Sequence, residues 1–318
     1  MSPFQIPEFI KAPSVLVEEY GARQLSRLAA SGELHRVRRG LYLRTELWSS
    51  LKPWEQYRVH IQAVHELAHT APVFARQSAA QVMGLPLVRA PRPVETLCAA
   101  KNGGQSSNGV HRLPAIDGDP PPWQMYGLLV TQPHITARDM AVCLPLAQSL
   151  PAMDRLLSMR VLPGSPANVP LTFPVETIQL AISRLPYASQ KRRALRVLAA
   201  GNGLSQSAGE SLSRAIMLEN GFPAAALQVP FHDKRGLVGY PDFVWDEYKV
   251  LGKFDGFEKY SVQRYLKGRT PAQVVVAEKV REDRLRALGY SVVRWVWDDL
   301  ADPRRLPALL HEAGLPSR

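Results

Sequence analysis

Cysteine is scarce in this sequence, and so are the features that would place the chain in a membrane or outside the cell. The two cysteines, Cys98 and Cys143, lie far apart among apolar residues, which disfavours a disulfide framework and a zinc knuckle. No apolar run is long enough to cross a bilayer. The N-terminal residues lack the basic start and apolar stretch of a secretory signal. We therefore expect a cytoplasmic protein with no membrane partner.

Acidic side chains are also few relative to basic ones. The 318 residues include 39 Lys and Arg but only 28 Asp and Glu, so the formal net charge is +11. The apolar content of 46% is that of an ordinary globular protein. Such a charge favours a polyanionic partner, nucleic acid before membrane. A basic protein without such a partner is the alternative.

The length allows two or three domains with cores of their own. A Gly- and Ser-rich stretch at 201–209 is typical of a linker. We predict a multidomain α/β protein with an N-terminal domain at 1–75, a small α/β middle domain at 76–200 and a C-terminal α/β domain at 206–318. Within the middle domain, strands are expected at 94–99 and 126–131, and a helix at 137–157.

The N-terminal domain has the pattern of a helix followed by a basic hairpin. Residues 21–32 predict a helix with Leu25 facing inward and Gly32 at its end. Its outward residues are Arg23, Gln24 and Arg27. A hairpin with a Gly turn follows at 33–43, and it carries Arg36, Arg38 and Arg39. A short helix is expected before these elements, at 14–20.

This order is typical of a winged helix-turn-helix domain. The helix would meet base edges in the major groove of double-stranded DNA, and the arginines of the wing would meet phosphates. An amphipathic helix beside a hairpin with solvated arginines is the alternative.

The same stretch resembles the N-terminal domain of AbiEi-type antitoxins and their actinobacterial relatives. The matching residues are Gln24, Leu25, Leu28, Gly32, Leu34, Arg36, Val37, Arg39, Gly40 and Tyr42. The resemblance implies a transcriptional regulator of a toxin–antitoxin system, which binds DNA and has a cognate toxin as a possible partner.

A long helix is expected at 53–71, and it contains His65-Glu-Leu-Ala-His69. Two His four residues apart on one helix face can bind zinc, with the Glu as a general base. The motif needs a third ligand, and no His or Glu follows for 25 residues. We interpret the match as a coincidence and expect no zinc.

The C-terminal domain has the order helix, strand, strand, helix, strand. A turn centred on Asp246 and Glu247 would place Asp242 opposite Leu251. Because side chains alternate along a strand, Lys253 and Asp255 would share one face and approach Asp242.

This order resembles restriction-endonuclease-like nucleases of the PD-(D/E)XK type, and most closely the very-short-patch-repair-like branch. The matching pieces are Asp242-Phe243, Asp255-Gly256, Leu285 to Gly289, Arg294 and Trp297. The resemblance implies a magnesium site held by Asp242 and Asp255, with Glu210 as a further acid and Lys259 as the catalytic lysine. A carboxylate is expected two residues before Asp255, and Lys253 stands there instead.

Glu247 and Lys249 offer a literal version of the same signature. We reject it, because four residues after Asp242 place Glu247 in the turn itself.

Two functions follow from these patterns. The chain is either a DNA-binding regulator with a degenerate or rewired nuclease-like domain, or a Mg²⁺-dependent DNA endonuclease of defence or repair. Lys253 distinguishes the two functions, because a cation at the position of a metal ligand weakens Mg²⁺ binding and so disfavours the endonuclease. The oligomeric state is not specified by the sequence.

Overall fold

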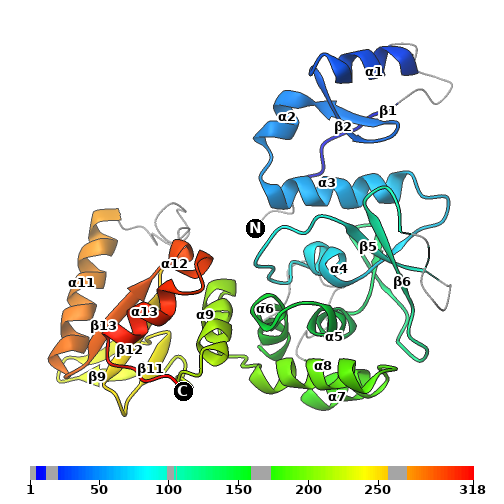
Figure 1. Ribbon diagram of the computed structural model, residues 1–318. Coiled ribbons are helices and arrows are strands. Elements are labelled where there is room, and N and C mark those ends of the chain that lie inside the picture. The colour runs from blue at the N-terminus through cyan, green and yellow to red at the C-terminus, as the bar shows by residue number, and fades with distance from the viewer. Residues whose placement is uncertain (1–4, 12–20, 99–103, 105, 159–172, 257–270) are drawn as a thin grey trace. The chain divides into compact units, whose positions relative to one another are not determined.

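The structure is a computed structural model that describes residues 5–11, 21–98, 104, 106–158, 173–256 and 271–318 (Figure 1). It divides into two compact units. Unit 1 comprises Met1–Cys143 and Arg160–Leu195, and unit 2 comprises Leu144–Met159 and Arg196–Arg318. The segments predicted as N-terminal and middle domains thus share unit 1, apart from 144–159 and 196–200. Both units mix helices with sheet, as the predicted α/β class requires.

Unit 1 begins with a three-stranded antiparallel sheet in the order β1-β3-β2. Its strands are β1 (Ile10–Lys11), β2 (Leu34–Arg38) and β3 (Leu41–Arg44). Three helices accompany it, α1 (Ala22–Ala30), α2 (Thr45–Ser50) and α3 (Pro53–Glu66). The turn between β2 and β3 uses Gly40 at a φ of 87°, a conformation that a side chain would strain. The predicted helix and hairpin are therefore confirmed, whereas the short helix expected at 14–20 lies outside the described residues.

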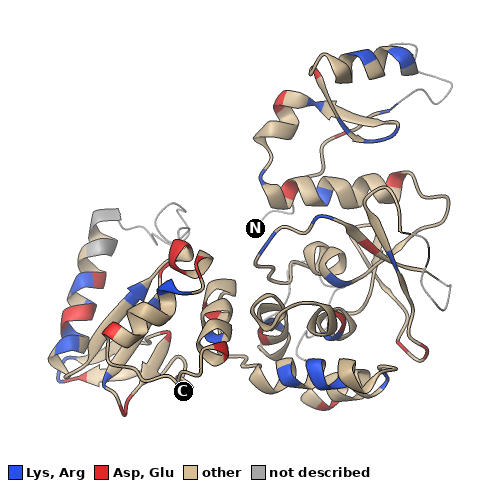
Figure 2. Ribbon diagram, viewed as in Figure 1, with Lys and Arg blue, Asp and Glu red and all other residues tan. Residues whose placement is uncertain are grey.

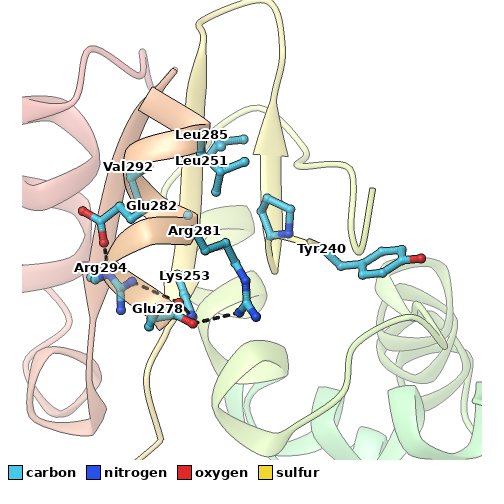
Figure 3. A pocket seen from close by; sticks show the side chains of 11 residues that line it. Tyr240, Leu251, Lys253, Glu278, Arg281, Glu282, Leu285, Val292 and Arg294 are labelled. Carbon is cyan, nitrogen blue, oxygen red and sulfur yellow. Dashed lines mark hydrogen bonds and ion pairs between the residues drawn. The ribbon is translucent and has the colours of Figure 1, made fainter. Parts of the chain in front are cut away.

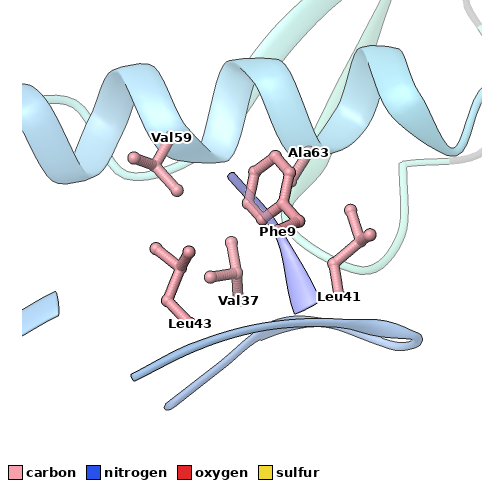
Figure 4. Packing of buried hydrophobic residues seen from close by; sticks show 6 residues of the cluster. All are labelled: Phe9, Val37, Leu41, Leu43, Val59 and Ala63. Carbon is pink, nitrogen blue, oxygen red and sulfur yellow. The ribbon is translucent and has the colours of Figure 1, made fainter. Parts of the chain in front are cut away.

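The two faces of this sheet are covered by different helices. Leu25 of α1 is fully buried against Leu34 and Tyr42. The opposite face packs against α3 through Phe9, Val37, Leu41, Leu43, Val59 and Ala63 (Figure 4). Apolar contacts occupy both faces of the hairpin, so a shift of its register by one residue would break them, and the register is fixed. The polar residues of the hairpin lie at the positions that these contacts do not use.

A five-stranded mixed sheet in the order β6-β5-β4-β8-β7 forms the rest of unit 1. Its strands are β4 (Val73–Phe74), β5 (Val94–Cys98), β6 (Val110–Pro114), β7 (Trp123–Met125) and β8 (Leu128–Val130). The pairs β5–β6 and β4–β8 are parallel. The accompanying helices are α4 (Arg76–Met83), α5 (Pro133–Cys143) and α7 (Val175–Ser183), together with α8 (Ala188–Ala200) as far as Leu195, where unit 1 ends.

The helix expected at 137–157 is two helices. Helix α5 ends at Cys143, and α6 (Leu146–Leu157) begins after Pro145. Proline has no N–H to donate and disfavours helical backbone at the residue before it, so the chain breaks at Leu144. The break also separates the units, since α5 belongs to unit 1 and α6 to unit 2.

Unit 2 is built on a three-stranded sheet in the order β11-β12-β13. Its strands are β11 (Phe243–Trp245), β12 (Val250–Phe254) and β13 (Ser291–Trp295), and a separate hairpin contains β9 (Phe231–Asp233) and β10 (Gly236–Gly239). The helices besides α6 are α9 (Ala208–Glu219), α11 (Pro271–Ala287), α12 (Trp297–Ala301) and α13 (Arg305–Glu312). Strands β11 and β12 are antiparallel, and β12 and β13 are parallel.

Helices cover both faces of this sheet. On one face, Leu251 and Val244 pack against Leu285 of α11. On the other, Trp295 donates its indole N–H to Ser213 of α9 at 2.8 Å. The predicted order of helix, strand, strand, helix, strand is thus present. Pro241 lies between β10 and β11, where its missing N–H interrupts no strand pairing.

The register of the β11–β12 hairpin differs from the predicted one. Val244 pairs with Leu251, so the pairing continues to place Asp242 opposite Lys253 rather than opposite Leu251. The reason is the turn, which occupies Asp246 to Lys249 and ends with Lys249 at a φ of 53°. As expected, Glu247 lies in this turn and is exposed.

Within the part of the chain that the structure describes, no helix combines the length and apolar character needed to cross a bilayer.

Candidate functional site

Helix α1 presents two arginines and a glutamine to solvent, together with Ser26. Arg23, Gln24 and Arg27 are exposed while Leu25 is buried, which is the arrangement that the amphipathic pattern predicts. The helix contains no acidic residue, so nothing within it neutralises the two guanidinium groups. Figure 2 marks the Lys and Arg positions in blue along the ribbon of α1 and of the hairpin that follows it.

The three arginines of the β2–β3 hairpin differ in their surroundings. Arg36 and Arg39 are exposed. Arg38 is half-buried and donates a hydrogen bond to the backbone carbonyl of Asn108 at 2.9 Å. Burial, and then the positive charge of Arg112, lower the pKa of Arg38. The hairpin is therefore tied to the start of β6 through a residue that the sequence pattern assigned to phosphate binding.

A cleft of about 1140 Å³ lies where the hairpin, the end of α3 and strands β5 and β6 meet. We call it the arginine cleft after its basic lining residues: Arg36, Arg38, Arg39, Arg92 and Arg112, together with His60 and His69. Among the described residues that line it, none is Asp or Glu. Such a concentration of one sign of charge raises the local concentration of anions.

Like charges in the arginine cleft act on one another. Burial, then the charges of Arg38 and His35, lower the pKa of His60, which favours its neutral form. Trp48 stacks on His35 with ring centroids 4.1 Å apart and meets His60 edge-on at 5.3 Å. Like charges repel at close range, and an anion that binds between them relieves the repulsion.

The His-Glu-x-x-His motif is not held on one helix. Helix α3 ends at Glu66, so His65 lies in its last turn and His69 lies beyond it. The expected helix at 53–71 was too long, since the chain leaves helical geometry before Pro72. The two imidazoles therefore do not share the helix face that the motif requires.

Purified protein is expected to contain no zinc bound to His65 and His69, because the helical spacing of the ligand pair is lost. Elemental analysis of protein freed from any affinity tag measures this directly. Stoichiometric zinc that disappears in His69→Ala would contradict the prediction.

In unit 2, Asp242 is buried at the start of the β11–β12 hairpin. It is 9% exposed, and its Oδ2 accepts a hydrogen bond from the backbone N–H of Phe254 at 2.9 Å. The carboxylate thus stabilises the pairing of the two strands. This contact agrees with a position opposite Lys253 in the observed register.

Lys253 lies against α11. Its ammonium forms an ion pair with the carboxylate of Glu278, which also accepts from Arg281 at 2.8 Å (Figure 3). Asp255 pairs with Arg294 at 2.8 Å. We call this set, with Glu282, the α11 charge network.

Arg294 joins the members of that network. It reaches Glu282 at 2.8 Å and Glu278 at 3.1 Å, in addition to Asp255. Burial alone would lower the pKa of Arg294, but the carboxylates of Asp255 and Glu282 raise it. The sequence pattern assigned no partner to Arg294, and it did not point to Glu278 or Glu282. Their spacing of four residues on one helix face was the available signal.

Glu210 occupies the first turn of α9. It accepts hydrogen bonds from the backbone N–H of Gln206 at 2.7 Å and from the Ser207 hydroxyl at 2.9 Å, while Ser207 accepts from the Glu210 N–H at 3.2 Å. Ser207 is thus the N-cap of α9, while the carboxylate of Glu210 reaches back to Gln206 and to the Ser207 hydroxyl. A serine at the start of a helix, with Glu three residues later, could have predicted this arrangement. Lys259 lies outside the described residues. Among those that are described, no three His, Cys, Asp or Glu side chains form a group that could hold a metal ion.

Two proteins of Mycobacterium tuberculosis, from strains CDC 1551 and H37Rv, are similar to this chain, and both are named as uncharacterized. Each is 28% identical over 190 residues, which cover 57% of this chain and 66% of the relative. The match therefore spans slightly less than two thirds of each relative. No known protein family matches the sequence. No solved structure matches it either.

Proposed function

We propose that the protein is a cytoplasmic DNA-binding regulator of the AbiEi-antitoxin-like kind. The observation that carries this proposal is the arginine cleft, in which five arginines and no described acid line one concave surface. A phosphodiester backbone supplies anions in a row, and the guanidinium group binds phosphate in a bidentate geometry. The resemblance of the N-terminal residues to these antitoxins points to the same partner.

Within this proposal, α1 is the recognition helix and the β2–β3 hairpin is the wing of a winged helix-turn-helix domain. Arg23, Gln24 and Arg27 are exposed on α1 and have the side chains that read guanine and adenine edges. Arg36 and Arg39 contact phosphates. Arg38 positions the hairpin by its hydrogen bond to the backbone carbonyl of Asn108, and phosphate contact is not its primary role.

The proposal is tested by titrating the full-length protein into labelled DNA duplex at several salt concentrations, beside vesicles of anionic lipid. Salt-sensitive binding to duplex is expected, because counterions are released from the phosphates. Binding to the vesicles without binding to the duplex would overturn the proposal.

Substituting Arg23 or Gln24 with alanine is expected to relax sequence preference. Each loss should cost about 1–3 kcal/mol at particular base pairs of the preferred site, while affinity for unrelated duplex changes little. Selection of bound sequences from a random duplex pool, repeated with each variant, measures the change. An unchanged set of selected sequences would remove α1 from the base-reading role.

We further propose that unit 2 has a restriction-endonuclease-like fold that does not hydrolyse DNA. Its element order supports this fold, and the pairing of Lys253 with Glu278 supports the loss of hydrolysis. Asp242 and Asp255 are the residues that would hold Mg²⁺. They fit the ion poorly, because the backbone N–H of Phe254 and the guanidinium of Arg294 already bind their oxygens. In addition, Lys253 stands at the position where a third carboxylate is expected.

The alternative is a Mg²⁺-dependent endonuclease with unit 1 as its targeting module. That function predicts nicking of plasmid DNA that needs Mg²⁺ and disappears in both Asp242→Ala and Asp255→Ala, with little change in melting temperature. A cognate toxin, implied by the antitoxin resemblance, is tested by co-purification with the product of the neighbouring open reading frame.

A further inference from the structure

The connection from α7 to α8 leaves an aromatic ring open to solvent. Tyr187 is 64% exposed, more than any other large apolar side chain that the structure describes. Its backbone carbonyl accepts a hydrogen bond from the N–H of Lys191 at 3.1 Å, so the helical bonding pattern of α8 reaches back to it. Leu195, 44% exposed, follows four residues after Lys191. Residues four apart lie on one side of a helix, so these three form a row.

The row lies in a basic stretch. Between Glu176 and Leu195 the sequence contains four Lys or Arg and no Asp or Glu. Arg192 is exposed next to Lys191, and neither side chain forms an ion pair or a hydrogen bond with another described residue. Figure 2 marks the cations of α8 in blue. We call Tyr187, Lys191, Arg192 and Leu195 the α8 edge.

The other two cations of the stretch are less available to a ligand of the α8 edge. Arg193 donates a hydrogen bond to the backbone carbonyl of Val142 at 3.4 Å. Arg184 lines a cavity of about 500 Å³ together with Asp117, and a carboxylate near a guanidinium weakens its attraction for anions. Lys191 and Arg192 are therefore the cations that a polyanion would contact here.

An aromatic ring beside cations matches a single strand of nucleic acid better than it matches a duplex or a lipid surface. In a duplex the faces of the bases are stacked on their neighbours, whereas a single strand exposes them to aromatic side chains. An interfacial helix buries a continuous apolar face in lipid. The exposed residues of α8 before Leu195 include Ser189, Arg192 and Arg193, which interrupt such a face.

We propose that the α8 edge binds single-stranded nucleic acid. One base stacks on the ring of Tyr187, and phosphates next to it contact Lys191 and Arg192. Four residues of helix rise by about 6 Å, and the base and the phosphate of one nucleotide are separated by a similar distance. This site is independent of the proposed duplex binding, since it uses neither α1 nor the arginine cleft.

Labelled oligothymidylate and oligouridylate of about 12 nucleotides, within the usual range of single-strand sites, are the probes. Fluorescence anisotropy is measured on full-length protein that carries Arg36→Ala and Arg39→Ala, so that the arginine cleft contributes less. Saturable, salt-sensitive binding of either oligomer is expected, and the tighter of the two identifies the preferred sugar. Failure of both oligomers to bind would overturn the proposal.

Substitutions of the exposed tyrosine test the stacking. Tyr187→Ala is expected to weaken the oligomer about tenfold (~1.4 kcal/mol), because it removes the surface on which a base stacks. Tyr187→Phe keeps the ring and should keep the affinity. Tyr240→Ala removes a tyrosine of unit 2 that is 56% exposed and should leave the affinity unchanged. Equal affinity of the Tyr187→Ala protein and its parent would exclude stacking at the α8 edge.

A charge variant tests the phosphate contacts. Replacing both Lys191 and Arg192 with alanine should reduce the slope of log affinity against log salt by about 0.7 per contact, so by roughly 1.4. In protein with an intact hairpin, the same variant should leave affinity for duplex unchanged. An unchanged slope for the oligomer would refute the contacts. Binding to phosphatidylglycerol vesicles that needs Tyr187, without binding of either oligomer, would assign the α8 edge to lipid instead. Oligomer binding without duplex binding would overturn the proposed function alone.

Discussion

Replacing both Arg36 and Arg39 with alanine is expected to weaken binding to duplex DNA of every sequence. Both side chains are exposed at the arginine cleft and have no acidic neighbour among its described lining residues. If each contacts one phosphate, the slope of log affinity against log salt should decrease in magnitude by about 0.9 per contact, so by roughly 1.8 for the pair. Fluorescence anisotropy at several salt concentrations measures both the affinity and the slope.

The matched control removes the same charge from unit 2. Arg304 and Arg305 are exposed near α13, with side chains 89% and 57% accessible, and their double alanine variant should keep the wild-type slope. Arg38 is a poor choice for this test, because its loss also frees the hairpin from Asn108. Identical slopes for wild type and for the Arg36 and Arg39 variant would exclude the hairpin from the DNA interface.

Lys253→Glu is expected to destabilise unit 2 by roughly 2–4 kcal/mol. The substitution removes one of the three cationic partners of Glu278 and sets a second carboxylate beside it. Both side chains are about one fifth exposed, at 21% and 18%, so solvent screens the repulsion only in part. Thermal and urea unfolding of the full-length protein, followed by a signal from the tryptophans of unit 2, measures the loss.

The charge swap gives the decisive comparison. Adding Glu278→Lys to Lys253→Glu restores an ion pair in which the acid and the base have exchanged positions. This double variant should recover a substantial part of the lost stability. Lys249→Glu, at the exposed hairpin turn, changes the same charge and should cost far less, because its ion pair with Asp246 is exposed to solvent. A Lys253→Glu protein as stable as wild type would show that the pair with Glu278 contributes nothing.

The same variants separate the two functions proposed for unit 2. Wild-type protein should not nick plasmid DNA in Mg²⁺, whereas Lys253→Glu restores the carboxylate that the resemblance expects. Cleavage by wild type at a rate that Lys253→Glu does not exceed would refute the account of a nuclease-like fold without hydrolysis.

The sequence by itself determined the local elements whose signals lie within a few residues. Helix α1 with Leu25 inward, the hairpin turn at Gly40, and the ends of α9 and α11 at Gly221 and Gly289 all follow from periodicity and from glycines with positive φ. The alternation of apolar and polar residues fixed which arginines of α1 face solvent. The N-cap at Ser207, which accepts from the N–H of Glu210, was also within reach, because its signal is a spacing of three residues.

Only the tertiary structure decided which charged side chains meet. The β11–β12 register depends on a four-residue turn, and a shift in that turn changes the residue opposite Asp242. Lys253 finds its partner on α11, which lies beyond the hairpin in the sequence, and the arginine cleft joins a hairpin to a sheet some 50 to 70 residues later. Sequence spacing carries no information about such contacts. They are set by the packing of whole elements, in which apolar burial dominates and charges pair where the packing leaves them.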